Sequence, residues 1–217
     1  MRIICLSNSF KRGGRCLAGT LIDEDLNIPL RNNRPIWVRP VCDTPHEEVP
    51  TNLTSDFKYY DVIEFTPVQD WARQDYQCEN FRIQNDKLNY VQRVDLTNCM
   101  DDLCDNNIYD NIFENRNKAI SQIEIDNLNY SLMMIKVTTF EVNNVKSPYR
   151  QNHQTRLIFK YNNDNYDLPI TDPVFKYNYQ YDQNILDSID KIYLVLSLGV
   201  EFRGYYYKLV ATILYLD

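Results

Sequence analysis

The sequence predicts a mainly β protein whose short strands close into barrels or sandwiches. Short apolar runs recur from one end of the 217 residues to the other, and turn-forming residues separate them. Hydrophobic residues make up 44% of the chain, which is enough to build a core. One stretch, residues 108–125, has helical spacing without Gly or Pro. Many short strands with one isolated helix are typical of β-barrels and β-sandwiches.

The predicted strands of the first half are apolar or alternating runs bounded by polar residues. They cover residues 2–7, 15–22, 36–41 and 61–68, and residues 77–83 are expected to form a short fifth strand or a bend. Residues 8–14 are predicted to form a polar, basic loop, in which Gly13 and Gly14 permit positive φ and close approach of another backbone. Gly19 within the second strand indicates a bulge. Because Pro40 has no N–H for a sheet ladder, the third strand is expected to lie at an edge or to end there.

The middle of the chain is predicted to link two domains. Residues 85–110 are mixed and polar, and the helical spacing over 108–125 predicts a helix that bridges the domains. We therefore expect a first barrel over residues 1–84, a linker with a helix over 85–127, and a second barrel over 128–217.

The second half restarts a β-rich pattern. Predicted strands cover residues 131–145, 155–161, 165–170, 192–202 and 206–216. Asn162-Asn163-Asp164 is a ready hairpin turn, and Arg203-Gly204 joins the last two strands. Residues 171–175 are predicted as a turn into a Tyr-rich loop, and residues 185–189 as one or two helical turns.

The net charge of −7 disfavours duplex DNA as a bulk electrostatic partner, because domains that grip phosphate backbones are usually basic. A local basic groove stays compatible with this total, since association follows the local field as well as the sum. No stretch approaches the ~20 apolar residues that span a bilayer. Residues 1–6 are too short for a signal sequence. We therefore expect a cytoplasmic protein with no membrane partner and with reduced cysteines.

The most unusual stretch is Gly13–Gly19, and we consider it together with Trp37–Pro40, which follows in the next predicted strand. It holds three of the five glycines of the chain. The candidate anion-binding side chains in and beside it are Lys11, Arg12, Arg15 and Arg39. Arginine suits phosphate because its planar fork matches phosphate oxygens, and backbone N–H groups near paired glycines can add a cradle. The alternative is structural: Arg15 and Arg39 are buried ion-pair partners of acids such as Asp172 and hold the two barrels together.

Aromatic side chains are candidate platforms on which nucleic-acid bases stack, at about 1–3 kcal/mol per base. The candidates are Trp37, Tyr59, Tyr60, Trp71, Tyr76, Tyr149, Tyr161 and Tyr177. Tyr149-Arg150, followed by His153 and Arg156, is the best interleaved basic and aromatic stretch of the second half. The alternatives are that most rings are core or half-buried sheet residues, since Tyr suits strands, and that this stretch is a mobile hairpin loop.

The sequence indicates no metal site, no cofactor and no catalysis. Cys99 and Cys104 have no second cysteine pair at ligand spacing, whereas structural zinc uses four ligands in paired spacings. The motifs G-x-S-x-G and H-E-x-x-H and the Rossmann glycine fingerprint do not occur. The paired acids Glu47-Glu48 and Asp101-Asp102 are expected to be solvated loop charges.

Several segments, taken in order, carry a likeness to a known family: Arg2–Gly19, Trp37–Pro40, Tyr76–Asn80, Tyr166–Phe175 and Lys208–Ile213. Together they resemble the prokaryotic dual OB-containing domain family over nearly the whole chain. The resemblance implies two small Greek-key barrels packed together with a linking helix, a nucleic-acid or nucleotide-binding role, and no established catalytic residues. It also implies a place in bacterial conflict or defence loci. OB-type barrels commonly bind strands with aromatic rings and a positive groove, and the acidity of this chain departs from that pattern.

Two main hypotheses follow for function. The first is a non-catalytic module that binds single-stranded DNA or RNA, or a nucleotide-like ligand, in a bacterial defence system. The second is a protein-interaction subunit of a defence complex, without nucleic-acid contact, whose partner is encoded nearby. The acidic charge and the 17 tyrosines favour the second, since Tyr and Trp often anchor interfaces. A hydrolase that uses carboxylates at an unrecognised site is a third, weaker alternative.

Overall fold

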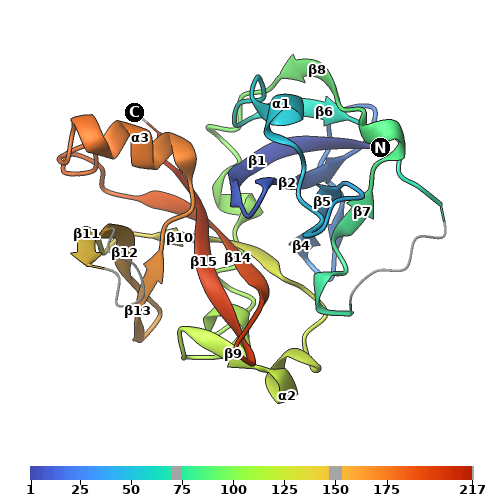
Figure 1. The fold of residues 1–217 in the computed structure, drawn as a ribbon. Helices are drawn as coiled ribbons and strands as arrows, with labels where there is room; N and C mark the ends of the chain where they lie inside the picture. The colour runs from blue at the N-terminus through green and yellow to red at the C-terminus, as the bar shows by residue number, and fades with distance from the viewer. Residues whose placement is uncertain (70–74, 147–152, 217) are drawn as a thin grey trace. The chain divides into compact units, whose positions relative to one another are not determined.

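The chain folds into two compact units, Met1–Leu103 and Cys104–Asp217. The computed structural model describes residues 1–69, 75–146 and 153–216. Each unit is built mainly from strands with few helices (Figure 1), which confirms the mainly β prediction. Within the described residues, no helix is long and apolar enough to cross a membrane. The division between the units falls inside the segment 85–127 that was predicted as the linker.

The first unit is organised around a six-stranded sheet with the strand order β7-β5-β2-β1-β6-β8. Its strands are β1 Arg2–Lys11, β2 Gly14–Ile22, β5 Trp37–Val41, β6 Asp61–Glu64, β7 Asn80–Arg82 and β8 Asn89–Arg93. A small ladder joins β3 Leu30–Arg31 to β4 Arg34–Pro35, and α1 spans Thr51–Thr54. Three 3-10 turns cover Asp75–Gln77, Gln84–Asp86 and Asp101–Leu103. The sheet therefore takes in β8, which lies within the predicted linker.

β1 and β2 form a long hairpin that is closed by Arg12-Gly13. The loop predicted over residues 8–14 is wrong, because β1 continues to Lys11 and pairs there with Gly14. Gly13 has φ +87°, the left-handed conformation that a tight hairpin turn requires. A basic strand end therefore replaces the expected loop.

Gly19 allows the backbones of β1 and β2 to approach closely. A Cβ at this position would lie 1.9 Å from the carbonyl oxygen of Ile4. The register shift predicted near Gly19 occurs, but the extra residue is in β1, between Cys5 and Ser7. Glycine is thus required here by the neighbouring strand.

β5 changes its pairing partner along its length. Trp37 and Val38 pair antiparallel with β2, whereas Arg39–Val41 pair in parallel with β7. Pro40 donates no hydrogen bond, and the bonds on either side of it come from Arg39 N to Glu79 O and from Ile83 N to Val41 O. The edge position predicted as one alternative is therefore wrong, since β5 lies between β2 and β7. The other alternative, an end near Pro40, agrees with the structure, because β5 ends at Val41.

The second unit contains a four-stranded sheet, β10-β14-β15-β9, and a three-stranded sheet, β11-β12-β13. The first sheet comprises β9 Ala119–Ser121, β10 Leu132–Val137, β14 Ile192–Phe202 and β15 Tyr205–Leu214. The second comprises β11 Phe140–Lys146, β12 His153–Tyr161 and β13 Asp164–Pro169. The predicted hairpins at residues 162–164 and 203–204 are confirmed. The single strand predicted over 131–145 is wrong, because β10 and β11 belong to different sheets.

The helices of the second unit differ from the prediction. The helix expected over 108–125 is wrong: this segment holds a 3-10 turn Ile112–Glu114, strand β9 and a four-residue helix, α2 Gln122–Ile125. Phe113 and Glu114 have φ values of 50° and 54°, which interrupt any α-helix. The Tyr-rich loop expected after residue 175 is instead α3, Pro173–Tyr181. The helical turns expected at 185–189 are non-helical turns.

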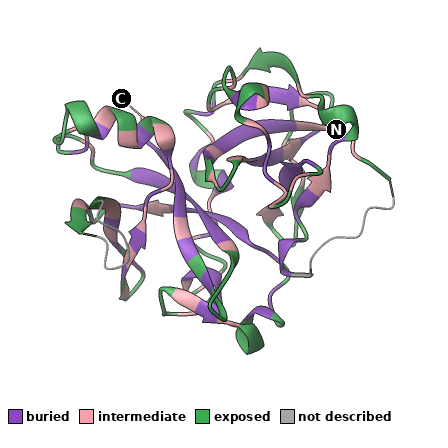
Figure 2. Cartoon of the chain, in the orientation of Figure 1, coloured by how far each residue is buried: buried purple, intermediate pink, exposed green. Residues whose placement is uncertain are grey.

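Each unit has its own buried core, formed by strand residues that face inward (Figure 2). The main core of the first unit contains Ile3, Cys5, Leu17, Val38, Cys42, Val49, Ile63, Phe65 and Ile83. Fully buried residues of the second unit include Leu132, Met134, Leu157, Leu168, Leu194 and Val210. The ends of the long hairpins remain exposed in both units.

Candidate nucleic-acid interface

The end of the β1–β2 hairpin gathers predicted cations around an exposed ring. Phe10 is 50% exposed, and Arg15 lies opposite it in the ladder. The guanidinium carbon of Arg15 is 4.5 Å from the centroid of the Phe10 ring. Arg12 is exposed in the turn, and Lys11 is half-buried beside it. The structure thus brings Lys11, Arg12 and Arg15 to one hairpin end.

Glu48 occupies the space beside the paired glycines. A Cβ at Gly13 would lie 2.5 Å from Glu48 Oε1. The Glu48 side chain accepts a hydrogen bond from His46 N at 2.9 Å, and its carbonyl accepts one from Thr44 Oγ1 at 2.8 Å. Burial raises the pKa of Glu48, but hydrogen bonds from the backbone and from Thr44 outweigh it and lower the pKa. The prediction of a solvated Glu48 is wrong, and its negative charge disfavours a phosphate in the glycine cradle.

Arg39 lies in a buried polar network rather than on an open surface. It is 2% exposed, and its Nη1 donates to Asn80 Oδ1 at 2.8 Å. Asn80 Nδ2 in turn donates to Glu47 Oε2 and to Gln77 Oε1, each at 3.0 Å. The network therefore holds Arg39 among buried polar side chains, where no base or phosphate reaches it from an open surface.

Lys11 lies close to this network. Burial lowers the pKa of Lys11, the thiol of Cys16 raises it, the charge of Arg39 lowers it further, and Glu47 and Glu48 oppose that decrease. Acids are thus interleaved with the cations, so the cluster is not a purely positive groove.

Trp37 is 5% exposed, because β5 packs it within the first unit. A base cannot stack on a ring that the protein covers, so Trp37 does not fit the predicted stacking role. The burial of Trp37 instead favours the alternative that it is a core residue of the sheet.

Arg156 is held within its own hairpin. Its Nε bonds Asp167 Oδ1 at 2.5 Å, its Nη2 donates to Asp167 O at 2.6 Å, and its Nη1 donates to Gln154 Oε1 at 2.7 Å. Burial raises the pKa of Asp167, but Lys118 and Arg156 outweigh that effect and lower it. The guanidinium therefore already binds partners in β12 and β13. Tyr149, Arg150 and Trp71 lie outside the described residues.

Asp172 begins α3. Its Oδ1 accepts hydrogen bonds from Val174 N at 2.9 Å and Phe175 N at 3.0 Å, and its Oδ2 accepts one from Ile213 N at 3.1 Å. The residue is 0% exposed. The carboxylate thus joins α3 to β15 within the second unit, while its predicted pairing with Arg15 and Arg39 stays a prediction.

Sequence reasoning missed an exposed aromatic surface at the end of the β14–β15 hairpin. Phe202, Tyr205 and Tyr207 are 55%, 49% and 41% exposed. The ring centroids of Phe202 and Tyr207 are 6.4 Å apart, and the guanidinium carbon of Arg203 is 5.2 Å from the Phe202 centroid. Tyr205 and Tyr207 alternate with the buried Tyr206, so the period-2 pattern of a correctly predicted strand contained the signal.

The two units therefore share one local feature. The longest hairpin of each ends in a guanidinium over an exposed phenyl ring, Arg15 over Phe10 and Arg203 over Phe202. Such cation–π pairs contribute roughly 0.5–1 kcal/mol at exposed sites and hold the guanidinium plane in place. Unstacked bases are commonly bound on aromatic rings and on arginine planes. Each hairpin end can thus accept a base by stacking.

The described residues offer no competing metal chemistry. Among them, no group of three or more His, Cys, Asp or Glu side chains could hold a metal ion. All six cysteines are free thiols. Burial raises the pKa of Cys5 to about 12, which keeps that thiol neutral.

Comparison with known proteins identifies one family. The family model described as the dual OB-containing domain matches residues 1–213. No curated protein matches the chain. Among solved structures, the chain is similar to the crystal structure of the tetrameric p202 HIN2, with 10% identity and a TM-score of 0.33. That alignment covers 100% of this chain and 91% of the other, and at this TM-score it carries no argument about function.

Proposed function

Because the chain belongs to the dual OB-containing domain family, we propose that it is a non-catalytic binding module for single-stranded nucleic acid or a nucleotide-like ligand. The observation that carries the proposal is the guanidinium–phenyl stack at the end of the longest hairpin in each unit. OB-type domains bind single strands by combining stacked aromatic rings with local positive charge.

The β14–β15 hairpin end is the stronger of the two surfaces. Phe202, Tyr205 and Tyr207 offer exposed rings, and Arg203 adds both a stacking plane and a cation. Stacking requires bases that are not already stacked in a duplex, so single strands are favoured over double strands. The net charge of −7 limits unspecific attraction to phosphates, so binding depends on these local groups.

We extend the proposal to the setting that the family resemblance implies. The chain acts in the cytoplasm as part of a bacterial defence system, and a protein encoded nearby supplies any effector activity. In this arrangement the chain itself binds and does not catalyse.

Fluorescence anisotropy with labelled single-stranded DNA, single-stranded RNA and duplex DNA tests the proposal. We expect the single strands to bind more tightly than the duplex, with an affinity that falls as the salt concentration rises. Phe202→Ala or Tyr205→Ala should each weaken binding roughly 5- to 150-fold, the equivalent of about 1–3 kcal/mol per stacked base.

Tyr90→Ala is the matched control, because Tyr90 is also an exposed tyrosine, 57% accessible, but lies on β8 of the first unit. It should leave the affinity unchanged. Absence of binding by every probe at low salt would refute the proposal, as would equal losses in the hairpin and β8 variants.

A second function, protein interaction, is favoured by α3. Val174, Tyr177 and Tyr181 are exposed at 52%, 61% and 76%, and their spacing places them on one face of the helix. The rings of Tyr177 and Tyr181 lie 5.0 Å apart. Exposed aromatic side chains on one helix face are typical anchors of a partner groove.

A native pull-down from cells that also express the neighbouring genes tests this alternative. We expect Tyr177→Ala with Tyr181→Ala to lose a partner that the wild-type chain retains, while Phe202→Ala retains it. If no partner is recovered with the wild-type chain, the interaction hypothesis fails.

A further inference from the structure

A polar pocket of about 600 Å³ opens in the second unit. It is lined by residues 106–111 and Arg116 on one side and by the β12–β13 turn, residues 162–164, on the other. Five of these residues are asparagines and two are aspartates, so amide and carboxylate groups dominate the walls. Its volume lies within the roughly 300–1,000 Å³ that is usual for small-molecule sites.

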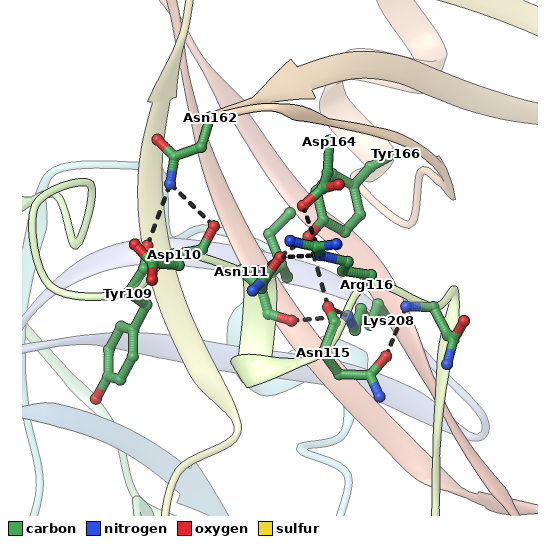
Figure 3. A network of polar contacts seen from close by, with 11 residues as sticks. Tyr109, Asp110, Asn111, Asn115, Arg116, Asn162, Asp164, Tyr166 and Lys208 are labelled. Atoms are coloured by element: carbon green, nitrogen blue, oxygen red, sulfur yellow. Dashed lines mark hydrogen bonds and ion pairs between the residues drawn. The ribbon is translucent and has the colours of Figure 1, made fainter.

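Side-chain hydrogen bonds hold the first wall against the strands. Asn106 bonds Lys136 of β10 in both directions, from Nδ2 to Lys136 O at 2.9 Å and from Lys136 N to Oδ1 at 2.7 Å. Tyr161 donates to Tyr109 O at 2.7 Å. Asn162 Nδ2 donates to Asp110 O at 2.9 Å (Figure 3). An irregular segment is thereby fastened to two separate sheets.

The far end of the same segment is held by a buried lysine and by an exposed arginine. Lys208 Nζ donates to Ile112 O at 2.7 Å and also to Asn115 O (Figure 3). Arg116 Nε donates to Asn111 Oδ1 at 3.3 Å and pairs with Asp164 Oδ2 at 3.2 Å. The pocket is therefore formed before any ligand arrives, which reduces the entropy lost on binding.

Three lining side chains retain hydrogen-bonding capacity. Asn107, Asp110 and Asn163 are exposed, and within the described residues their side chains make no hydrogen bond. The amides offer both donors and acceptors, the carboxylate accepts, and the terminal nitrogens of Arg116 donate. Two aspartates against one arginine disfavour an anionic ligand, because like charges repel at short range.

We propose that this pocket binds a neutral ligand through vicinal hydroxyl groups. A hydroxyl both donates and accepts, so a pair of them can donate to Asp110 and accept from Asn163 or Arg116. Two sources carry this chemistry, the ribose of a ribonucleoside and a free saccharide. The ribose form rests on the proposed function, since the pocket would add recognition of the RNA sugar to that binding, whereas the saccharide form does not.

Saturation-transfer NMR and titration calorimetry on the full chain test the proposal with ribonucleosides, the matching 2′-deoxyribonucleosides and a panel of neutral monosaccharides. Saturable binding of ribonucleosides with at least a tenfold preference over deoxyribonucleosides identifies ribose. Saturable binding of a monosaccharide identifies the saccharide. No saturable binding by any of these probes overturns the proposal, as does equal binding of the ribo and deoxy forms without any monosaccharide binding.

Two variants locate the site. Asp110→Asn keeps the side-chain shape and removes the charge, and Asn163→Ala removes one amide from the turn. Each should weaken ligand binding at least tenfold, whereas Asn165→Ala, an exposed asparagine outside the pocket, should not change it. Unchanged binding in both pocket variants overturns the assignment.

The same variants separate this proposal from the proposed function. Asp110→Asn should leave the binding of single-stranded DNA unchanged, because the hairpin aromatics carry that binding. Loss of DNA binding in Phe202→Ala with retained ligand binding would show that the two sites act independently.

Discussion

Lys208 provides a quantitative test of the forces that hold the second unit. The residue is 0% exposed on β15, and its ammonium lies 5.4 Å from the centre of the Tyr166 ring. Burial lowers the pKa of Lys208 from 10.5 to about 7, and the charge of Glu124 opposes this decrease only in part. We expect this burial to make the stability of the protein depend on pH.

The sign follows from proton binding. Between pH 7 and pH 10.5 the unfolded chain holds the lysine proton and the folded chain has largely lost it. Stability therefore rises with pH across this window. Integrating the difference in bound protons from pH 7 to pH 9 gives a gain of about 2 kcal/mol in the free energy of unfolding.

Urea denaturation at pH 7, 8 and 9 measures the effect in three proteins: wild type, Lys208→Met and Lys160→Met. Lys160 is an exposed lysine of β12 in the same unit, so it controls for the loss of one positive charge. Wild type and Lys160→Met should gain about 2 kcal/mol more than Lys208→Met between pH 7 and pH 9.

Buried thiols act in the opposite direction and cancel in the comparison. Burial raises the pKa of Cys5 to about 12, and burial with a hydrogen bond to Asp86 raises that of Cys42 to about 12. Their ionisation favours the unfolded chain above about pH 8.5 in all three proteins. An identical pH dependence in wild type and Lys208→Met would refute the reasoning, and would mean that the carbonyl oxygens of Ile112 and Asn115 keep the ammonium charged.

Three further predictions concern backbone contact, capping and ion pairing. Gly19→Ala should cost about 3 kcal/mol or more by chemical denaturation, because its Cβ would meet a β1 carbonyl at 1.9 Å, whereas Gly199→Ala, with nearest atoms at 3.5 Å, should be nearly neutral. Asp172→Ala should cost about 2–4 kcal/mol and reduce the helical signal in circular dichroism, since buried backbone donors lose their acceptor; unchanged stability would contradict the capping role. The lowered pKa of Asp167 implies stability that is present above about pH 4 and lost as the pH falls through its folded value. Arg156→Ala should reduce that acid dependence in a pH titration of the melting temperature, and the Lys118 contact should retain the rest.

The sequence predicted those strands in which local pattern and burial agree. The hairpin at Asn162-Asn163 and the strands around Arg203-Gly204 follow from alternation and turn residues alone. α3 was missed although its start carries a local signal, an aspartate cap followed by proline at the first helical position. The many tyrosines favoured a non-helical interpretation, yet burial of Phe175 and Tyr179, four residues apart, favours the helix.

The segment 108–125 shows why a spacing pattern can mislead. Two of its apolar residues, Ile108 and Ile123, are exposed, whereas Ile112, Phe113 and Ile120 are buried. They are buried by an irregular loop that Lys208 holds from 96 residues away, and no local pattern contains that contact. Long-range hydrogen bonds thus stabilise an irregular loop in the segment where a helix was predicted.

The candidate site was predictable only in part. The basic and aromatic composition of the β1–β2 hairpin end was visible in the sequence, as Arg15 and Phe10 show. The burial of Trp37 and Arg39 depends on how β5 packs between two strands, and residue types alone do not reveal it. Arg203 was assigned to a turn without notice of the rings beside it, although the alternation of Tyr205, Tyr206 and Tyr207 along the strand carried that signal.

The strand order of the second unit also has a consequence for protein synthesis. β14 and β15 are the inner strands of the four-stranded sheet, yet they leave the ribosome after its outer strands, β9 and β10. Until they emerge, β10 lacks the neighbour to which Leu132 pairs at Ser197, and β9 lacks the neighbour to which Ile120 pairs at Tyr206. Unpaired strand edges on a nascent chain promote aggregation, because they can pair with other chains. Translation speed near the end of this unit, and chaperones that cover β9 and β10 meanwhile, should therefore influence how much of the protein reaches its folded state.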